Sequence, residues 1–397
     1  MTAGVMNVRR ASLAPPEDAT EAPRAARAHA APIGPADAPL LAVTLLLTVF
    51  GVVMVYSASA VFAERVYHNA QFFLVRQGLY ALAGLAAMIA LAGVDHRRLR
   101  ALSYPALGIT FALMALVPVI GHRVNGAARW IRLGPINLQP SELAKVALVA
   151  WLAHSLSKKQ EKIRTFSVGF LPHLLIAGML MLLCLQQRDM GSAVVLLSLT
   201  FTLMFIAGAR LGYIMAAGIA ALPIGVWLVR GTDYRHRRWL AFLNPFDPQY
   251  RRGISYQLVE SLMGFGSGGT TGVGLGDSRQ KLFYLPEAHT DFISAIIGEE
   301  LGFVGVAAMV LAYAVLVWRG VVIAVRAKDD HGTYLAFGMT TLLALQAMIN
   351  LGVAMGELPT KGLTLPFISY GGSSLIVDLA AVGVLLSVSR SAATPAR

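Results

Sequence analysis

The sequence predicts an all-α polytopic membrane protein with about ten transmembrane helices and a long outward loop between the seventh and eighth helices. The chain of 397 residues is 56% hydrophobic and only 14% charged, whereas a typical soluble domain is about 25% charged. Its mean hydropathy is +0.63. Several apolar runs approach the ~20 residues that are needed to span a bilayer.

The chain divides into a tail, a membrane domain and a short second tail. Residues 1–38 are polar and rich in Ala, Pro and Arg, so we expect a disordered tail and no signal peptide. Residues 39–390 form the expected membrane domain, and 391–397 follow it. The expected helices lie near 40–60, 72–93, 102–120, 141–157, 170–186, 191–208, 211–230, 291–318, 332–356 and 368–389. The segment from 291 is long enough to tilt or to begin outside the membrane.

Basic residues in the short loops predict the orientation. The loops at 95–100, 157–164 and 318–330 are rich in Lys and Arg and fall on the same side as the basic leader. By the positive-inside rule this side is cytoplasmic, so both termini are expected inside. The net charge of +12 then indicates orientation and contact with anionic lipid, and no nucleic-acid partner is expected.

Four loops of interest are expected to face outward: 121–140, 187–190, 231–290 and 357–367. The loop at 231–290 is too long for a plain connector, and we expect its first half to be polar and irregular. A phosphate-binding GxxxxGK[ST] motif is absent from the sequence, so ATP-driven work is not expected. The single cysteine, Cys184, excludes an internal disulfide and provides no metal-ligand spacing.

The stretch "YLPEAHTDFISAIIGEELGFVG" (284–305) places Asp291 at the entrance of an apolar helix. At helical spacing Asp291 shares a small, partly polar face with Gly298 and Gly302, which would let another helix approach closely. An isolated acid there would simply suit the helix dipole. Its acidic and polar neighbours favour a functional site instead: they are Glu287, His289, Glu299 and Glu300. The two last acids are expected to pair with arginines of neighbouring helices.

The stretch "LGPINLQPSELAK" (133–145) is typical of a loop followed by a helix start, with Ser141 as the expected N-cap. Glu142 and Lys145 are three residues apart and share one face, which we expect near the outer surface. Two interpretations stay open. The two side chains form a local ion pair, or Lys145 and the helix N-terminus together hold a phosphate.

Two further outward stretches carry arginines. In "NGAARWIR" (125–132), Arg129 and Trp130 are either an interfacial arginine and aromatic pair or a contact for an anionic ligand. In "QQRDMGSA" (186–193), a salt bridge between Arg188 and Asp189 is the simplest expectation.

The stretch "GELPTKGLTLPFISYGGSS" (356–374) breaks helical structure beside the membrane with its prolines and glycines. Such a backbone must be buried in protein or line a cavity, and Lys361 and Ser369 could face that cavity. The polar motifs therefore converge on one side of the membrane. This placement suits a substrate with a lipid tail and an anionic head, rather than a small soluble substrate.

Three strings resemble the SEDS family (shape, elongation, division and sporulation proteins): "RWIRLGPINLQPSELAK", "GVGLGDSRQKLFYLPEAHTDFISAIIGEELG" and "NLGVAMGELPTKGLTLPFISYGGSS". The resemblance covers nearly the whole chain after the leader and is closer to the cell-division members than to the rod-shape members. The chain departs from the family pattern at Arg188, where many members have proline, at Glu357, where an apolar residue is common, and at Asn137, which is basic in some division members.

The resemblance implies a fold of ten transmembrane helices and a peptidoglycan glycosyltransferase that polymerises lipid II during septal wall synthesis, with inversion and release of undecaprenyl diphosphate. It implies that Asp291 is the catalytic base. The expected substrate-binding residues are Lys145, Glu142, Arg129, Trp130, Gln139, Asp189, His289, Lys361 and Ser369. No resident cofactor is expected, although a divalent cation, Mg²⁺ or Mn²⁺, could use Asp291 as a ligand.

The resemblance also implies partners and a location. Expected partners are lipid II, a class B penicillin-binding protein transpeptidase, other membrane proteins of the division machinery and membrane lipid. The expected location is the bacterial inner membrane at the division septum. Two other functions use the same sequence features: a lipid II flippase, which needs the cavity but no base, and a scaffold without catalysis that only recruits the transpeptidase.

Overall fold

The computed structural model describes residues 34–393 except 125, 126, 135, 232 and 252, so most of the two expected tails lies outside the described residues. Ten helices correspond one to one with the ten predicted segments. They are α1 (Ala38–Tyr67), α2 (Phe72–Gly93), α3 (Leu99–Ile120), α4 (Pro140–Lys158), α5 (Leu171–Gln186), α6 (Met190–Ile206), α7 (Leu211–Arg230), α11 (Ile293–Arg326), α12 (Asp330–Ala354) and α13 (Gly372–Ala393).

The chain is a polytopic helical membrane protein, as predicted. Within the described residues, seven helical stretches are long and apolar enough to cross a membrane. The helices α6 and α7 are apolar but shorter in their described parts, and α4 is less apolar because it carries Glu142, Lys145 and other polar side chains. Large apolar side chains such as Leu82 and Ile89 of α2 are more than 60% exposed, as expected for a surface that faces lipid.

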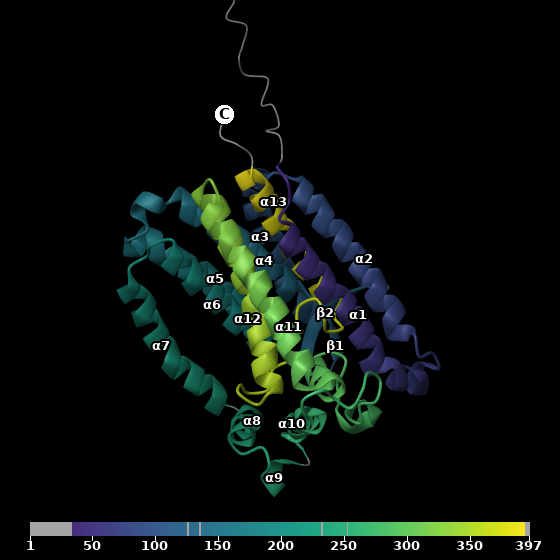
Figure 1. Ribbon diagram of the computed structural model, residues 1–397. Coiled ribbons are helices and arrows are strands. Elements are labelled where there is room, and N and C mark those ends of the chain that lie inside the picture. Colours follow the sequence, from purple (N-terminus) through teal and green to yellow (C-terminus); the bar gives the residue numbers. More distant parts are fainter. Residues whose placement is uncertain (1–33, 125–126, 135, 232, 252, 394–397) are drawn as a thin grey trace, which may run out of the picture.

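The two described ends of the chain meet at one end of the bundle, which we call the terminal end (Figure 1). Asp37 caps α1 through the amide of Leu40 at 3.0 Å and forms an ion pair with Arg319 of α11. The backbone amide of Asp37 also donates to the hydroxyl of Ser389 in α13. These contacts hold the start of the first helix against the end of the last one.

The opposite end, which we call the loop end, carries a small sheet and three further helices (Figure 1). The sheet has the order β1 (His122–Val124), β2 (Ala127–Leu133) and β3 (Ile136–Leu138), with both pairs antiparallel. The expectation of an irregular first half for 231–290 is wrong, because it contains α8 (Asp233–Leu243), α9 (Pro248–Arg251) and α10 (Tyr256–Gly268). Tertiary contacts stabilise these helices: Ala241 is buried, and its carbonyl accepts from the Ser255 hydroxyl at 3.0 Å.

Helix α11 is interrupted at Gly302, whose φ of +63° lies in the left-handed region that glycine tolerates. The break frees backbone groups of Glu299, Glu300, Phe303 and Val304, and the backbone of 269–274 replaces the lost helical partners. The bonds are Val273 N to Glu299 O at 3.0 Å, Gly274 N to Glu300 O at 3.1 Å, Phe303 N to Gly269 O at 2.9 Å and Val304 N to Thr270 O at 3.1 Å. The outer loop is therefore inserted into the helix.

The two acids of α11 also hold this loop. The Glu300 carboxylate forms an ion pair with Lys281 at 2.9 Å and accepts from the Ser57 hydroxyl at 2.7 Å. The Glu299 carboxylate accepts from the hydroxyl of Ser278 and from backbone amides, those of Arg279 and Gln280. The expectation that both acids pair with arginines of neighbouring helices is wrong, because their partners come from the loop and from α1.

Candidate functional site

Asp291 is partly buried and lies at the loop end, between the outer loop and the first turn of α11. Its main chain is tethered to another helix: the Asn350 side-chain amide of α12 donates to the carbonyl of Asp291 at 2.9 Å and to that of Leu363 at 2.7 Å. A Cβ placed on Gly362 would lie 2.9 Å from the Asp291 carboxylate. The segment around Gly362 therefore lies directly against the acid.

A second set of bonds joins the same two segments. The Ser369 hydroxyl donates to the carbonyl of Thr290 at 2.6 Å and accepts from the amide of Leu365 at 2.8 Å. The amide of Tyr370 donates to the carbonyl of His289 at 2.9 Å. Ser369 is buried and does not face a cavity as expected. Its hydroxyl instead fixes the backbone beside Asp291.

The electrostatic surroundings raise the pKa of Asp291 to about 7. Burial is the largest cause, the negative charge of Glu287 adds to it, and the positive charges of Arg129 and Arg238 partly oppose it. Arg129 comes from β2 and Arg238 from α8, so the charges of two other loop-end elements act on this acid. A carboxyl group whose pKa lies near the working pH is suited to general-base chemistry.

Arg129 is held in place by the turn between α5 and α6. Its guanidinium donates to the carbonyls of Gln187 at 3.3 Å and Arg188 at 2.7 Å, while its neighbour Trp130 is partly exposed. Across the site, the Lys361 ammonium lies 3.4 Å from the sulfur of Met190, the first residue of α6. Both predicted cations therefore lie at the loop end.

Asp189 has partners other than the expected Arg188. It caps α6 by accepting from the amide of Ser192 at 3.0 Å, and it accepts from the hydroxyls of Ser192 at 2.7 Å and Ser141 at 3.0 Å. The expectation that Ser141 is the N-cap of α4 is wrong, because the residue that precedes the helix is Gln139. The side-chain amide of Gln139 donates to the Ser141 hydroxyl at 3.0 Å.

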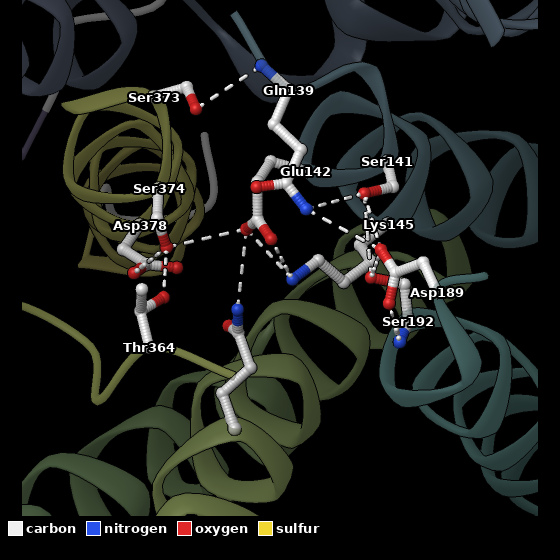
Figure 2. Close-up of polar contacts among 11 residues, drawn as sticks. Gln139, Ser141, Glu142, Lys145, Asp189, Ser192, Thr364, Ser373, Ser374 and Asp378 are labelled. Atoms are coloured by element: carbon white, nitrogen blue, oxygen red, sulfur yellow. Dashed lines mark hydrogen bonds and ion pairs between the residues drawn. The ribbon is translucent and has the colours of Figure 1, made fainter. Parts of the chain in front are cut away.

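A buried polar cluster links α4, α12 and α13 inside the bundle (Figure 2). The Lys145 ammonium is fully buried and lies 2.8 Å from the Glu142 carboxylate, which confirms the ion pair. The expectation that Lys145 faces outward is wrong. The Gln346 amide, oriented to satisfy both neighbours, accepts from Lys145 at 2.7 Å and donates to Asp378 at 3.2 Å.

Serine and threonine hydroxyls extend this cluster toward the loop end. Ser374 lies 3.4 Å from the Glu142 carboxylate, 3.3 Å from that of Asp378 and 2.6 Å from the Thr364 hydroxyl (Figure 2). Thr364 belongs to the segment that carries Lys361. The cluster is thus continuous with the segment against which Asp291 lies.

His289 packs in an aromatic cluster. Its ring centroid lies 4.5 Å from that of Phe73, 5.7 Å from Tyr370 and 5.8 Å from Phe62. Burial lowers the pKa of His289, and the nearby Glu287 charge opposes this shift. Burial therefore favours the neutral imidazole, which belongs to this aromatic cluster.

The described part of the chain contains no preformed metal-binding site made of protein side chains. There, no three or more His, Cys, Asp or Glu side chains lie together in a way that could hold an ion. The divalent cation at Asp291 stays a prediction.

The structure adds residues that the sequence interpretation missed. Asn350 holds Asp291, Gln346 and Asp378 complete the buried cluster, and Gly362 gives the acid room. Asp378 carried a usable signal, because an acid inside an apolar segment is a functional candidate by default. Gln346 carried none, because only the packing of distant segments gives it a role, and Gly362 was predicted only as one of the helix-breaking residues of 356–374.

Comparisons with known proteins show what this chain is similar to. Residues 37–394 match the family model FTSW_RODA_SPOVE, described as "Cell cycle protein". The chain is 49% identical to "Probable peptidoglycan glycosyltransferase FtsW" of Geobacter metallireducens, over 90% of this chain and 96% of the relative.

Two solved structures share the fold. One is described as "Structural coordination of polymerization and crosslinking by a peptidoglycan synthase complex". It has a TM-score of 0.75 and 31% identity, and the match covers 90% of this chain and 98% of that chain. The other is the rod shape determining protein RodA of Thermus thermophilus, with a TM-score of 0.67, 31% identity and coverage of 89% of this chain and 97% of that chain.

Proposed function

Because this chain belongs to the FtsW, RodA and SpoVE family of cell cycle proteins, we propose that it is a peptidoglycan glycosyltransferase that polymerises lipid II. The observation that carries the proposal is the environment of Asp291. Its carboxyl group has a pKa raised to about 7. Hydrogen bonds hold its carbonyl and that of its neighbour Thr290, and the charges of Arg129 and Arg238 act on it from two other elements. That combination provides a base together with stabilisation for an anion.

In the proposed reaction, the 4-hydroxyl of the GlcNAc of one lipid II attacks C1 of the MurNAc at the end of the growing chain. Asp291 accepts the hydroxyl proton as the new C–O bond forms. The bond from C1 to the diphosphate oxygen breaks, so undecaprenyl diphosphate leaves with its electron pair and the anomeric centre is inverted. Arg129 and Lys361 stabilise the negative charge of that leaving group.

The remaining candidates divide into positioning residues and wall residues. Glu142, Lys145, Gln139 and Asp189 fix the starts of α4 and α6 from the buried side. Ser369 fixes the Asp291 segment. His289 and Trp130 are proposed as the aromatic wall for the sugar rings.

We further propose that the loop end faces outward and both termini face the cytoplasm, at the division septum. The basic loops at 95–100 and 157–164 support this orientation through the positive-inside rule. The proposed partner is a class B penicillin-binding protein transpeptidase that docks on the loop end, alongside other membrane proteins of the division machinery. Membrane lipid surrounds the bundle.

A lipid II flippase is the second candidate, and two observations favour it. An ionisable cluster lies deep among α4, α12 and α13, and helix α11 is discontinuous. Both features are common in transporters. A flippase needs no general base, so the two functions differ in what they require of Asp291.

The test is polymerisation of purified lipid II by the protein with its transpeptidase partner. We expect Asp291→Asn to reduce the rate by about 10²-fold or more, because the amide cannot accept the proton, while folding and partner binding are kept. The matched control is Asp277→Asn, an exposed acid of the same loop, which should retain the rate. An Asp291→Asn protein that polymerises at the wild-type rate would exclude this base.

A further inference from the structure

Arg76 carries a positive charge within a membrane helix, and the reaction steps above do not use it. It lies in the second turn of α2, at the loop end, and its side chain is half-buried. Among the described residues, no carboxylate forms an ion pair with Arg76. An ionisable side chain within a transmembrane helix is a functional candidate by default, and a guanidinium without a carboxylate partner is suited to binding a phosphate group.

An aromatic ring and a hydroxyl group hold this guanidinium. Its central carbon lies 4.2 Å from the centroid of the Phe72 ring, which is a cation–π contact. Burial raises the pKa of Tyr370, and a hydrogen bond between the Arg76 and Tyr370 side chains opposes that rise. Neither contact neutralises the positive charge. Because a guanidinium carries several N–H donors, the bond to Tyr370 leaves donors for an anion.

A chain of contacts connects Arg76 with the segment of Asp291. The ring centroids of Tyr370 and His289 are 5.7 Å apart, and the Tyr370 amide donates to the His289 carbonyl at 2.9 Å. Phe73, one turn before Arg76, contacts both rings: its centroid lies 4.9 Å from that of Tyr370 and 4.5 Å from that of His289. His289 precedes Asp291 by two residues. The contacts between the proposed base and this cation therefore run through a cluster of aromatic rings.

The neighbouring side of α2 is accessible from the bilayer. The helix lies at the edge of the bundle (Figure 1), and three large apolar residues on one side of it are exposed: Val75, Leu79 and Leu82. Gln77 lies on the opposite side and is buried. Arg76 stands between these two sides, where the anionic group of a lipid can reach it.

The reaction proposed above, on which this inference rests, requires two diphosphate sites. The diphosphate of the growing chain leaves from the carbon that the acceptor hydroxyl attacks, so it must lie beside Asp291. In the acceptor lipid II, the attacking hydroxyl is on the GlcNAc and the diphosphate is on the MurNAc. The two sugar rings therefore separate the acceptor diphosphate from the base. We propose that Arg76 binds the diphosphate of the acceptor lipid II, whose sugar rings lie over the aromatic cluster.

The experiment follows a single coupling step by the purified full-length protein with its transpeptidase partner. The donor is lipid II with a blocked 4-hydroxyl, which cannot attack. The acceptor is lipid II with a methylene group in place of the oxygen between C1 and the diphosphate, which cannot lose that group. The KM of each substrate is measured while the other is saturating.

Arg76→Gln should raise the KM of the acceptor about tenfold, because one charge-assisted hydrogen bond is lost, and leave kcat and the KM of the donor unchanged. Arg76→Lys keeps the charge but loses the forked donors, so a smaller rise in the same KM is expected. Arg65→Gln is the matched control. Arg65 is exposed at the end of α1, and its guanidinium lies 4.8 Å from the centroid of the Phe283 ring.

Thermal unfolding verifies that each variant folds. An unchanged acceptor KM in a folded Arg76→Gln protein overturns the proposal and leaves Arg76 as an arginine that only contacts lipid headgroups. A rise in the donor KM alone also overturns it, because Arg76 would then belong to the site of the leaving group. Failure of the wild-type protein to couple the two substrates would contradict the proposed transferase function together with this inference. Coupling that is insensitive to Arg76 contradicts this inference alone.

Discussion

Asn350 of α12 donates its side-chain amide to the main-chain carbonyl of Asp291 at 2.9 Å. The proposed base is thus positioned by a helix of the membrane bundle, although it is carried on an outer loop. The same amide reaches the carbonyl of Leu363 at 2.7 Å. One side chain therefore sets the distance between the acid and the segment that carries Lys361.

Asn350→Asp should reduce polymerisation by roughly 10- to 100-fold, because misplacing a reacting group by about 1 Å can cost that much. A carboxylate oxygen in place of the amide nitrogen would face two carbonyls and push the segments apart. Asn350→Ala only removes the tether, so we expect a smaller loss. Steady-state kinetics should show lower kcat with little change in KM. Equal effects of the two variants, or a loss explained by thermal unfolding alone, would contradict a positioning role.

Glu287→Gln should shift the acid limb of the pH–rate profile to lower pH. The base works when it is ionised, so activity is present above the pKa of about 7 and is lost as the pH falls through it. Glu287 raises the pKa of Asp291 by its negative charge, and its neutralisation lowers that pKa. Arg129→Gln should move the limb the other way. The measurement is kcat/KM between pH 5 and 9, and identical profiles would exclude Asp291 as the titrating base.

Lys145→Met should destabilise the protein by about 3–5 kcal/mol, because it leaves Glu142 buried without its partner. Lys145→Met/Glu142→Leu removes both charges and should recover most of that loss. Thermal unfolding in detergent gives the comparison.

The exchanged pair, Glu142→Lys/Lys145→Glu, tests the two interpretations of this motif. A purely structural ion pair should tolerate the exchange, and retained polymerisation would support that interpretation. If Lys145 acts on phosphate, the exchange should abolish activity, because the acid would repel the ligand.

Gly272→Ala should alter partner dependence without removing the base. Gly272 has a φ of +82°, and a Cβ there would collide with the Glu300 backbone, so the loop that completes α11 must shift. We expect the transpeptidase to raise activity by ordering this loop. The measurements are polymerisation with and without the partner and hydrogen exchange over 253–290. Unchanged exchange on partner binding, together with unaltered partner dependence in every loop variant, would mean that coupling takes another route.

The sequence by itself determined the ten helices, because a bilayer-spanning helix needs about 20 apolar residues. Such a run of consecutive apolar residues can be recognised without knowing any tertiary contact. It also determined that Asp291 stands at a helix entrance and that Glu142 and Lys145 share a face, since these relations follow from helical spacing alone. The helices α8 and α10 were missed because they lie outside the longest apolar runs, and contacts such as Ser255 with Ala241 stabilise them.

Only the tertiary structure decided which partners each charge has. Lys145 proved buried because α12 and α13 supply Gln346 and Asp378 around it. Glu300 pairs with Lys281 because the break at Gly302 admits the outer loop. These contacts join residues far apart in the chain, and their free energy depends on burial and distance. A sequence records which charges exist, whereas packing decides which of them are desolvated and therefore must be paired.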